Sequence, residues 1–450
     1  MASDSSTKKV KVCVVGAGVA GLAAARELRR EGHDVAVLEQ AGGVGGQWLY
    51  EEDTAIDGTD PLGVAGVHSS VYASLRLITP RETMGFSDFP FRPTGDGDAR
   101  RFPCHAEFLR SRRGEVETEE VFDAVVVAVG NYSQPRLPSI DGMDTWRRRQ
   151  LHSHSYRVPD SFDGEGVVVV GCNVSGKDIA LELCRIAMEV HISARSTEEA
   201  MATPAMSKML ARHGNLHLRP LIARLCEDGT AVFADGSRVV ADAVVYCTGY
   251  NYSYPFLGTG GKVTVDDNRV GPLYEHVFPP ELAPSLSFLG IPAMVVVPRF
   301  YEAKARWVAQ VLSGRRELSP AGEMLRAAEE YVRGREAAGV EKRRTHDVFD
   351  LGEEFCECSC GFPRLEEWTK ELIWSSINAM LDDVEAFRDD FHGTELVADG
   401  LRRHGWIQLA PAPQPPHLED IDVDDDNEEG LQPVQTNQTV ASPLGLINSA

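Results

Sequence analysis

The sequence predicts an α/β fold with parallel β-sheets, because short valine-rich runs alternate with amphipathic helical patterns. The same order of apolar strand, glycine-rich turn and helix occurs twice, first after Val15 and again after Val170. Two more apolar runs, at 121–129 and 239–249, have the β-branched character of strands buried on both faces of a parallel sheet. These observations predict two Rossmann-like, dinucleotide-binding units in one chain.

The first glycine-rich turn follows the strand at 12–15 and reads GAGVAG. In such a turn the first glycine allows the tight bend, the second lets the backbone approach a pyrophosphate, and the third lets the helix pack against the strand. The next strand ends at Glu39, whose carboxylate suits a ribose hydroxyl, so FAD or NAD fits this unit better than NADP. The residues predicted to hold this dinucleotide are Gly16, Ala17, Gly18, Val19, Ala20, Gly21 and Glu39.

The second glycine-rich turn reads GCNVSG and follows the strand at 167–170. Asn173 replaces the middle glycine, and the turn is still expected because asparagine tolerates left-handed conformations better than most residues. The next strand, at 190–193, ends without an acid and is followed by Arg195, which suits a 2′-phosphate. The alternative is an ordinary surface arginine. The residues predicted to hold NADPH are Gly171, Cys172, Asn173, Val174, Ser175, Gly176 and Arg195.

The composition disfavours several classes of function. A net charge of −23 argues against nucleic acid or an anionic membrane as partner. No apolar run is long enough to span a bilayer, and the polar N-terminus has no signal-peptide core, so we expect a cytoplasmic protein without a membrane span. The nine cysteines include no CxxC pair, so the sequence predicts neither a metal site nor a redox disulfide.

The motifs divide the chain into domains. Residues 10–145 together with 250–405 are predicted to form the FAD-binding domain, with a mostly helical C-terminal part, and residues 146–249 the NADP-binding domain. Residues 410–450 are acidic and proline-rich, and they are predicted to be disordered because they cannot bury enough apolar surface. Two such sites in one chain imply hydride transfer from nicotinamide to flavin. The reduced flavin could then serve a quinone or oxygen, whereas a disulfide reductase is disfavoured.

Several segments together resemble the flavin-containing monooxygenases, and most closely the plant branch similar to glucosinolate S-oxygenases. The resemblance spans roughly 10–405 and rests on GAGVAG, GGQW, HSSVYASLR, PRETMGFSDFPF, LHSHSYRVP, GCNVSG and YCTGYNYSYPFL. It implies that NADPH reduces FAD, that O2 adds to give a C4a-hydroperoxyflavin, and that one oxygen atom passes to a soft S or N of a small molecule. The protein's task is then mostly to shield the oxidant from water.

The resemblance also implies roles for single residues. Gln47 and Trp48 would lie near the flavin. The family's FxGxxxHxxxY pattern falls on Trp146, Arg148, His152 and Tyr156, with an arginine where the family has glycine. For His152 and the neighbouring His154 we favour a structural or domain-linking role over that of a base or metal ligand.

Two departures from the family pattern bear on activity. Ile78 occupies the place of the family's asparagine, and because isoleucine cannot hydrogen-bond, the oxygenated intermediate is expected to leak peroxide; the catalytic residue is therefore unassigned. The FAD domain is expected to be shortened near 111–121, since only thirteen residues separate Phe108 from Phe122. The alternatives are thus an uncoupled NADPH oxidase that makes peroxide, and a non-catalytic NADP-binding relative with a defective FAD site.

Overall fold

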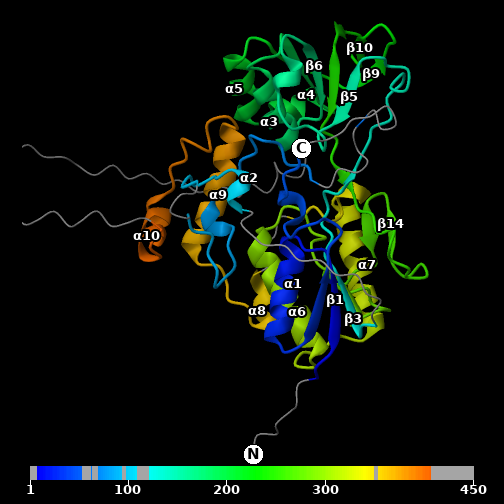
Figure 1. The fold of residues 1–450 in the computed structure, drawn as a ribbon, viewed down its shortest axis with the longest axis vertical. Helices are drawn as coiled ribbons and strands as arrows, with labels where there is room; N and C mark the ends of the chain where they lie inside the picture. Colours follow the sequence, from blue (N-terminus) through cyan, green and yellow to red (C-terminus); the bar gives the residue numbers. More distant parts are fainter. Residues whose placement is uncertain are drawn as a thin grey trace, which may run out of the picture.

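The computed structural model describes residues 8–52, 62, 69–93, 98–108, 121–348 and 353–406. Figure 1 shows two α/β lobes stacked along the long axis of the molecule, with a group of further helices beside them. The first lobe is built on a four-stranded sheet and the second on a five-stranded sheet. The predicted shortening near 111–121 lies almost wholly outside the described residues, and the predicted tail at 410–450 lies outside them altogether.

The sheet of the first lobe is parallel and has the strand order β16-β3-β1-β2. Its strands are β1 (Lys11–Val15), β2 (Asp34–Leu38), β3 (Ala124–Val127) and β16 (Leu286–Phe288). The helices of this lobe are α1 (Val19–Arg30), α6 (Val297–Leu312), α7 (Ala321–Ala337) and α8 (Glu353–Cys360). Helix α6 packs against both α1 and α8, so residues from the two ends of the chain build one lobe.

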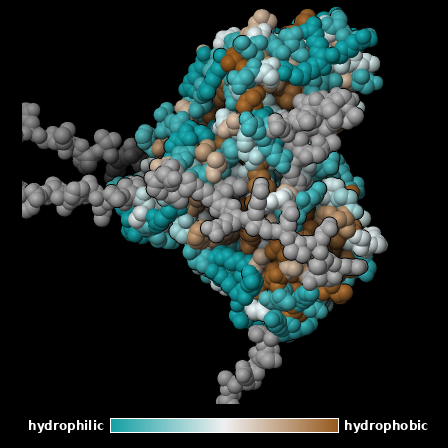
Figure 2. All heavy atoms as spheres, viewed as in Figure 1, coloured by the Kyte–Doolittle hydropathy of each residue, from teal (hydrophilic) through white to brown (hydrophobic). Residues whose placement is uncertain are grey.

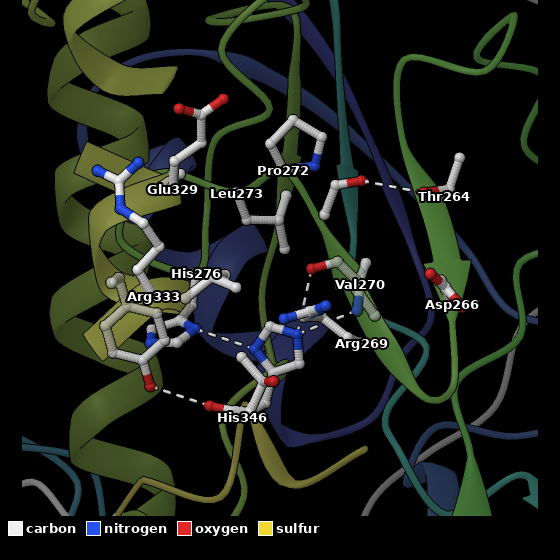
Figure 3. A pocket seen from close by; sticks show the side chains of 15 residues that line it. Thr264, Asp266, Arg269, Val270, Pro272, Leu273, His276, Glu329, Arg333 and His346 are labelled. Carbon is white, nitrogen blue, oxygen red and sulfur yellow. Dashed lines mark hydrogen bonds between the residues drawn. The ribbon is translucent and has the colours of Figure 1, made fainter. Parts of the chain in front are cut away.

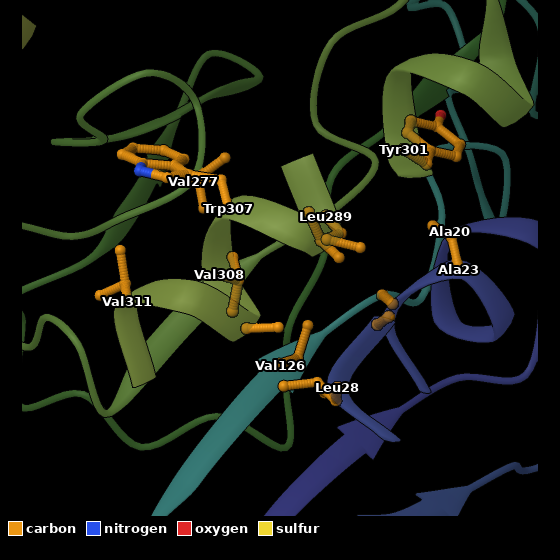
Figure 4. Close-up of a cluster of buried hydrophobic side chains, with 14 of the residues drawn as sticks. Ala20, Ala23, Leu28, Val126, Val277, Leu289, Tyr301, Trp307, Val308 and Val311 are labelled. Carbon is orange, nitrogen blue, oxygen red and sulfur yellow. The ribbon is translucent and has the colours of Figure 1, made fainter. Parts of the chain in front are cut away.

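The core of the first lobe lies between the sheet and the pair α1 and α6, as Figure 4 shows. Leu28 of α1 and Val126 of β3 are fully buried there, next to Val308 of α6. Because β1 is covered on both faces, Val12, Cys13 and Val14 are all buried, which explains its unbroken apolar run.

The sheet of the second lobe is also parallel, with the order β5-β12-β6-β7-β8. Its strands are β5 (Arg149–His152), β6 (Gly166–Val170), β7 (Glu189–Ser193), β8 (Leu216–Arg219) and β12 (Ala243–Tyr246). Helices α3 (Val174–Leu183), α4 (Thr197–Met201) and α5 (Pro204–Arg212) follow its strands. A small antiparallel sheet adds β9 (Ile222–Leu225), β10 (Thr230–Phe233) and β11 (Arg238–Val240).

The central strand β6 shows why the sequence of this lobe reads as it does. Val167 and Val169 point into one core with residues of α3 and α5, whereas Val168 and Val170 point into another with residues of β9 and β10. Successive side chains of a strand face opposite sides, so a strand between two cores must be apolar at every position.

The two lobes are joined by paired connections. The chain leaves the first lobe through β4 (Gln134–Pro135) and returns through β13 (Tyr250–Asn251), and these short strands pair antiparallel. A hairpin of β14 (Thr264–Asp266) and β15 (Arg269–Gly271) follows the return. The remaining helices are α2 (His105–Phe108), α9 (Glu367–Asp382) and α10 (Glu395–Arg403), with 3-10 turns η1 (Gly46–Trp48), η2 (Arg81–Thr83), η3 (Asp160–Phe162) and η4 (Lys342–Arg344).

The predicted α/β fold with two Rossmann-like sheets and a helical C-terminal part is confirmed, whereas the domain boundaries stay predictions. The prediction of a single strand at 239–249 was wrong, because this segment contributes to two strands, β11 and β12, which belong to different sheets. The chain turns between them at Asp242, whose carboxylate accepts a hydrogen bond 3.0 Å long from the backbone N–H of Gly166. Within the described ranges, no helix is long and apolar enough to cross a bilayer. Figure 2 shows a largely hydrophilic upper lobe and more apolar surface on the lower one.

Candidate functional site

Both glycine-rich turns lie at the carboxyl ends of central parallel strands. The first turn joins β1 to α1, and the second joins β6 to α3. In open α/β sheets, ligands bind outside the carboxyl ends of the strands, and a helix N-terminus there attracts an anion. The fold thus supplies one candidate dinucleotide site in each lobe.

The glycines of the first turn are required for different reasons. Gly16 has φ +104°, and a Cβ there would lie 2.6 Å from the carbonyl oxygen of Ala128; a Cβ on Gly21 would lie 1.9 Å from the carbonyl oxygen of Gly16. Gly18 differs, because its Cβ would meet only the Cα of Gly46, at an ordinary 3.7 Å. Packing within the described chain therefore does not require glycine at 18, whereas close approach of a pyrophosphate does.

Glu39 connects the end of β2 to this turn. Its carboxylate accepts hydrogen bonds from the backbone N–H of Ala17 at 2.6 Å and of Ala41 at 2.9 Å. These bonds fix the carboxylate at the turn, where a dinucleotide-binding fold places an acid against a ribose hydroxyl. The structure therefore brings Glu39 to the turn, as the sequence predicts.

The GGQW segment lies directly on the first turn. The N–H of Gly45 donates to the carbonyl of Ala17 at 3.1 Å, and η1 then carries Gln47 and Trp48 to the same edge of the sheet. The N-cap Gly18 makes no side-chain cap bond and the first turn of α1 holds no acidic residue, so within that turn no negative side chain opposes an anion at the helix N-terminus. These residues fit a dinucleotide diphosphate such as that of FAD.

The edge of this first sheet is open among the described residues. Strand β2 is its outermost strand, and Val37 and Leu38 are 39% and 51% exposed. The predicted shortening near 111–121 lies almost wholly outside the described part of the chain and stays a prediction.

The second turn repeats this geometry with one difference. Gly171 has φ +114° and its Cβ would lie 2.4 Å from the carbonyl oxygen of Cys247, while a Cβ on Gly176 would lie 2.0 Å from the carbonyl oxygen of Gly171. Asn173 was expected to tolerate a left-handed conformation, and this reasoning was wrong: its φ is −92° and it caps α3, with its side chain accepting from the N–H of Val174. Asparagine suits the N-cap position because its side-chain oxygen can accept a hydrogen bond from a free helix N–H. Cys172, Val174 and Ser175 lie in the same strand-to-helix connection.

Arg195 lies at the same sheet edge as the second turn, because it follows β7, the neighbour of β6. Its Nη1 lies 3.0 Å from Oε1 of Glu341, and both side chains are about half exposed. Sequence reasoning missed Glu341, since it is 146 residues away and belongs to no motif.

Buried histidines lie where the second lobe meets the connector strand β13. His152 ends β5, and its ring centroid is 5.4 Å from that of Tyr250; the ring centroid of His154 is 5.7 Å from the same tyrosine. Burial, together with the neighbouring His154, lowers the pKa of His152 to about 4. A neutral, packed imidazole beside a connector fits the structural role predicted for this pair.

The rest of that sequence pattern is also held by packing. Trp146 is buried, and the hydroxyl of Tyr156 donates to Glu182 of α3 at 2.8 Å. Arg148 pairs with Asp242, near the turn between β11 and β12. The arginine at the family's glycine position thus has an ion-pair partner in this lobe.

Ile78 lies in a loop that is anchored to α3. Its side chain is 39% exposed, and the carbonyl of its neighbour Leu77 accepts from Nε of Arg388 at 3.3 Å. Arg388 also donates to both carboxylate oxygens of Asp178, at 3.1 and 2.7 Å. The buried Arg388–Asp178 pair was not predicted, because its members are 210 residues apart.

A cavity of about 400 Å³ lies between α7 and the hairpin β14–β15 (Figure 3). On its wall the Nδ1 atoms of His276 and His346 are 3.1 Å apart, and Nε2 of His346 lies 3.0 Å from the backbone nitrogen of Val270. Burial lowers the pKa of both imidazoles, to about 4 for His346. No residue of the glycine-rich turns is among those that line this cavity.

The fold and the two turns define an oxidoreductase with two dinucleotide sites. Comparison with known proteins gives the family. The sequence profile described as "Flavin-binding monooxygenase-like" matches residues 107–205 and 206–355, and one described as "NAD(P)-binding Rossmann-like domain" matches 14–75. This chain belongs to the flavin-binding monooxygenase-like family.

Relatives and solved structures agree with this assignment. The chain is 46% identical to flavin-containing monooxygenase FMO GS-OX-like 9 of Arabidopsis thaliana, over 88% of this chain and 96% of the relative. Its structure resembles S-allyl-L-cysteine S-oxygenase from Allium sativum with a TM-score of 0.80 and 39% identity, over 89% of this chain and all of that one. Tmm from a Pelagibacter strain, at 22% identity and a TM-score of 0.68, shares the fold.

The predicted enzyme class and cofactors are therefore confirmed. The protein is an NADPH- and O2-dependent flavin monooxygenase that uses FAD and oxygenates soft S or N atoms of small molecules. The individual cofactor-binding residues stay predictions, as does the cytoplasmic location.

Proposed function

We propose that the protein transfers one oxygen atom to the sulfur of a small thioether. The observation that carries this proposal is the similarity to S-allyl-L-cysteine S-oxygenase over the full length of that protein. Sulfur is a soft nucleophile that takes an oxygen atom without prior activation, so the protein must supply access and shape rather than an acid-base group.

In this proposal each lobe binds one cofactor. Gly18 and the open N-terminus of α1 would bind the diphosphate of FAD, and Glu39 its ribose, with Gln47 and Trp48 beside it. Gly171, Gly176 and the N-terminus of α3 would bind the diphosphate of NADPH, and Arg195 its 2′-phosphate. When bound, the flavin supplies the oxygen-activating chemistry.

The groups between the lobes support oxygen transfer because they are poor proton donors. Burial raises the pKa of Cys247 and of Tyr250 to about 12, and His152, with its pKa lowered to about 4, carries no extra proton near neutral pH. Early proton delivery would divert oxygen to peroxide, so these three groups, which do not readily release a proton near neutral pH, would favour oxygen transfer to the substrate.

A second candidate function is peroxide production from NADPH, and Ile78 favours it. Its side chain offers no hydrogen bond, although its loop is fixed to α3 through Arg388. In this case NADPH would be consumed and its two electrons would be recovered as hydrogen peroxide instead of oxygenated product.

The full-length, FAD-loaded protein decides between these functions. S-Allyl-L-cysteine and a tertiary amine of similar size are each incubated with NADPH and labelled O2, and sulfoxide, N-oxide, peroxide and consumed NADPH are measured. The proposal expects a labelled sulfoxide that accounts for most of the NADPH. Recovery of the NADPH equivalents as peroxide would establish the second candidate, and N-oxide without sulfoxide would overturn the thioether assignment.

A further inference from the structure

Three arginines from distant parts of the chain gather at the edge of the second glycine-rich turn. Arg136 follows β4, Arg195 follows β7, and Arg343 lies in η4. We call these residues the arginine cluster. Nothing in the sequence pattern connects Arg136 or Arg343 with a nucleotide.

Glu341 lies within the cluster. Its Oε1 pairs with Nη1 of Arg195 at 3.0 Å, and its Oε2 accepts from Nε of Arg343 at 2.8 Å and lies 2.6 Å from Nη2 of the same residue. The hydrogen bond from Arg343 and the charges of both arginines hold the pKa of Glu341 below its usual range. One carboxylate therefore bridges two of the three arginines.

The third arginine, Arg136, is placed at this edge by its backbone, because its N–H donates to the carbonyl of Gly249, which follows β12, the neighbour of β6. Burial, followed by the positive charges of Arg343 and Arg195, lowers the pKa of the Arg136 guanidinium, while Asp267 and Glu341 act in the opposite sense. Among the residues that the structure describes, its guanidinium makes no hydrogen bond or ion pair, whereas its backbone N–H is fixed to the carbonyl of Gly249 at 2.9 Å. A half-buried guanidinium without an ion-pair partner is electrostatically costly, and an anion bound beside Arg136 would reduce that cost.

The position of the arginine cluster in the fold indicates which anion it binds. The N–H of Gly171 donates to the carbonyl of Ser193 at 2.9 Å, so the loop that bears Arg195 begins beside the second turn. In a dinucleotide-binding fold, the end of the second strand faces the 2′ position of the adenine ribose. A phosphate there carries up to two negative charges and offers three oxygens, which three guanidinium groups can bind with paired N–H donors.

We propose that Arg136 and Arg343 join Arg195 in binding the 2′-phosphate of NADPH, and that Glu341 is an internal counter-ion which the phosphate displaces. This inference rests on the use of NADPH at the second turn. The Arg195–Glu341 pair is about half exposed on both sides, and such ion pairs contribute little, so a phosphate with up to two charges can displace Glu341 from Arg195. Arg136 and Arg343 then help determine the preference for NADPH over NADH.

Direct binding tests this proposal without a catalytic assay. Calorimetric titration of the FAD-loaded, full-length protein compares adenosine 2′,5′-bisphosphate with ADP, which lacks the 2′-phosphate. We expect Arg136→Ala and Arg343→Ala each to weaken the bisphosphate about tenfold and to leave ADP unchanged. Glu341→Gln removes the competing charge and is expected to strengthen bisphosphate binding severalfold. Arg333→Ala, an exposed arginine of α7 outside the cluster, is the matched control and is expected to change neither ligand.

The outcomes separate this inference from the proposed function. If the wild type binds the bisphosphate more tightly than ADP and the arginine variants keep the same ratio of affinities, this inference is overturned, and the use of NADPH at the second turn still stands. A wild type that binds both ligands equally removes the NADPH assignment and the inference with it. If an arginine variant has the circular dichroism of the wild type but binds both ligands more weakly by the same factor, its role in binding the phosphate is overturned. Arg136→Lys replaces Arg136→Ala if the alanine variant does not fold. Weaker bisphosphate binding by Glu341→Gln overturns the counter-ion role.

Discussion

Replacing Gly176 by alanine is expected to weaken NADP⁺ binding at least tenfold, about 1.4 kcal/mol. The new Cβ would lie 2.0 Å from the carbonyl oxygen of Gly171, so the first turn of α3 must move by about 1 Å to restore a normal contact. A shift of this size takes an N–H from about 3 Å to about 4 Å from a phosphate oxygen, beyond hydrogen-bond range. A hydrogen bond to a charged group contributes about 1.5–3 kcal/mol, which sets the expected loss.

The affinity for NADP⁺ is measured by titration, with tryptophan fluorescence as the signal. Gly214→Ala is the control variant. Gly214 lies in the same lobe, and a Cβ there meets nothing within 4 Å. Helix propensity alone favours alanine over glycine within α3 by about 1 kcal/mol, so weaker binding cannot be assigned to a poorer helix. Binding by Gly176→Ala within about twofold of the wild type would refute the close-packing argument.

Three further predictions concern coupling, stability and pH. Ile78→Asn is expected to raise the yield of oxygenated product per NADPH at least twofold, because one added hydrogen bond contributes about 0.5–1.5 kcal/mol. Ile78→Leu adds no hydrogen bond and is expected to leave this ratio unchanged. The yields of product and peroxide are measured for both variants. Arg388→Met removes the cationic partner of the 9% exposed Asp178 carboxylate, which keeps the hydrogen bond from the Tyr72 hydroxyl at 3.3 Å, and is expected to lower the free energy of unfolding by about 3 kcal/mol. Urea unfolding measures this loss against the exposed-site variant Arg403→Met, and a loss equal to that of the control would contradict a stabilising role of the ion pair. His346, with its pKa lowered to about 4, stays neutral in the folded protein while the unfolded chain takes up a proton near pH 6.5, so stability falls as the pH drops between these values. His346→Gln is expected to reduce that loss by up to about 3 kcal/mol, and an unchanged pH dependence of urea unfolding would show that burial does not depress this pKa.

The parts predictable from the sequence are those set by local geometry. The apolar run at 167–170 indicated a strand, and the structure shows that this strand lies between two cores, with successive side chains facing opposite sides. Gly16 and Gly21 indicated a tight strand-to-helix turn, because a Cβ at either position collides with backbone only a few residues away or on the adjoining strand. Glu39 could be placed at the turn because parallel strands end at a common edge. The split of 239–249 was not predictable, since both halves are equally apolar and only the partner strands differ.

The sequence by itself therefore determined the α/β class, the two glycine-rich turns and the family, because each depends on residues that are neighbours along the chain or on motifs of fixed spacing. Only the tertiary structure decided which charges meet: Arg195 with Glu341, and Arg388 with Asp178. Such pairs form when packed helices and sheets bring together segments more than a hundred residues apart, and no local periodicity records that approach. The same reason explains Asn173, whose role as a helix cap depends on its backbone angles and not on its place in a glycine pattern.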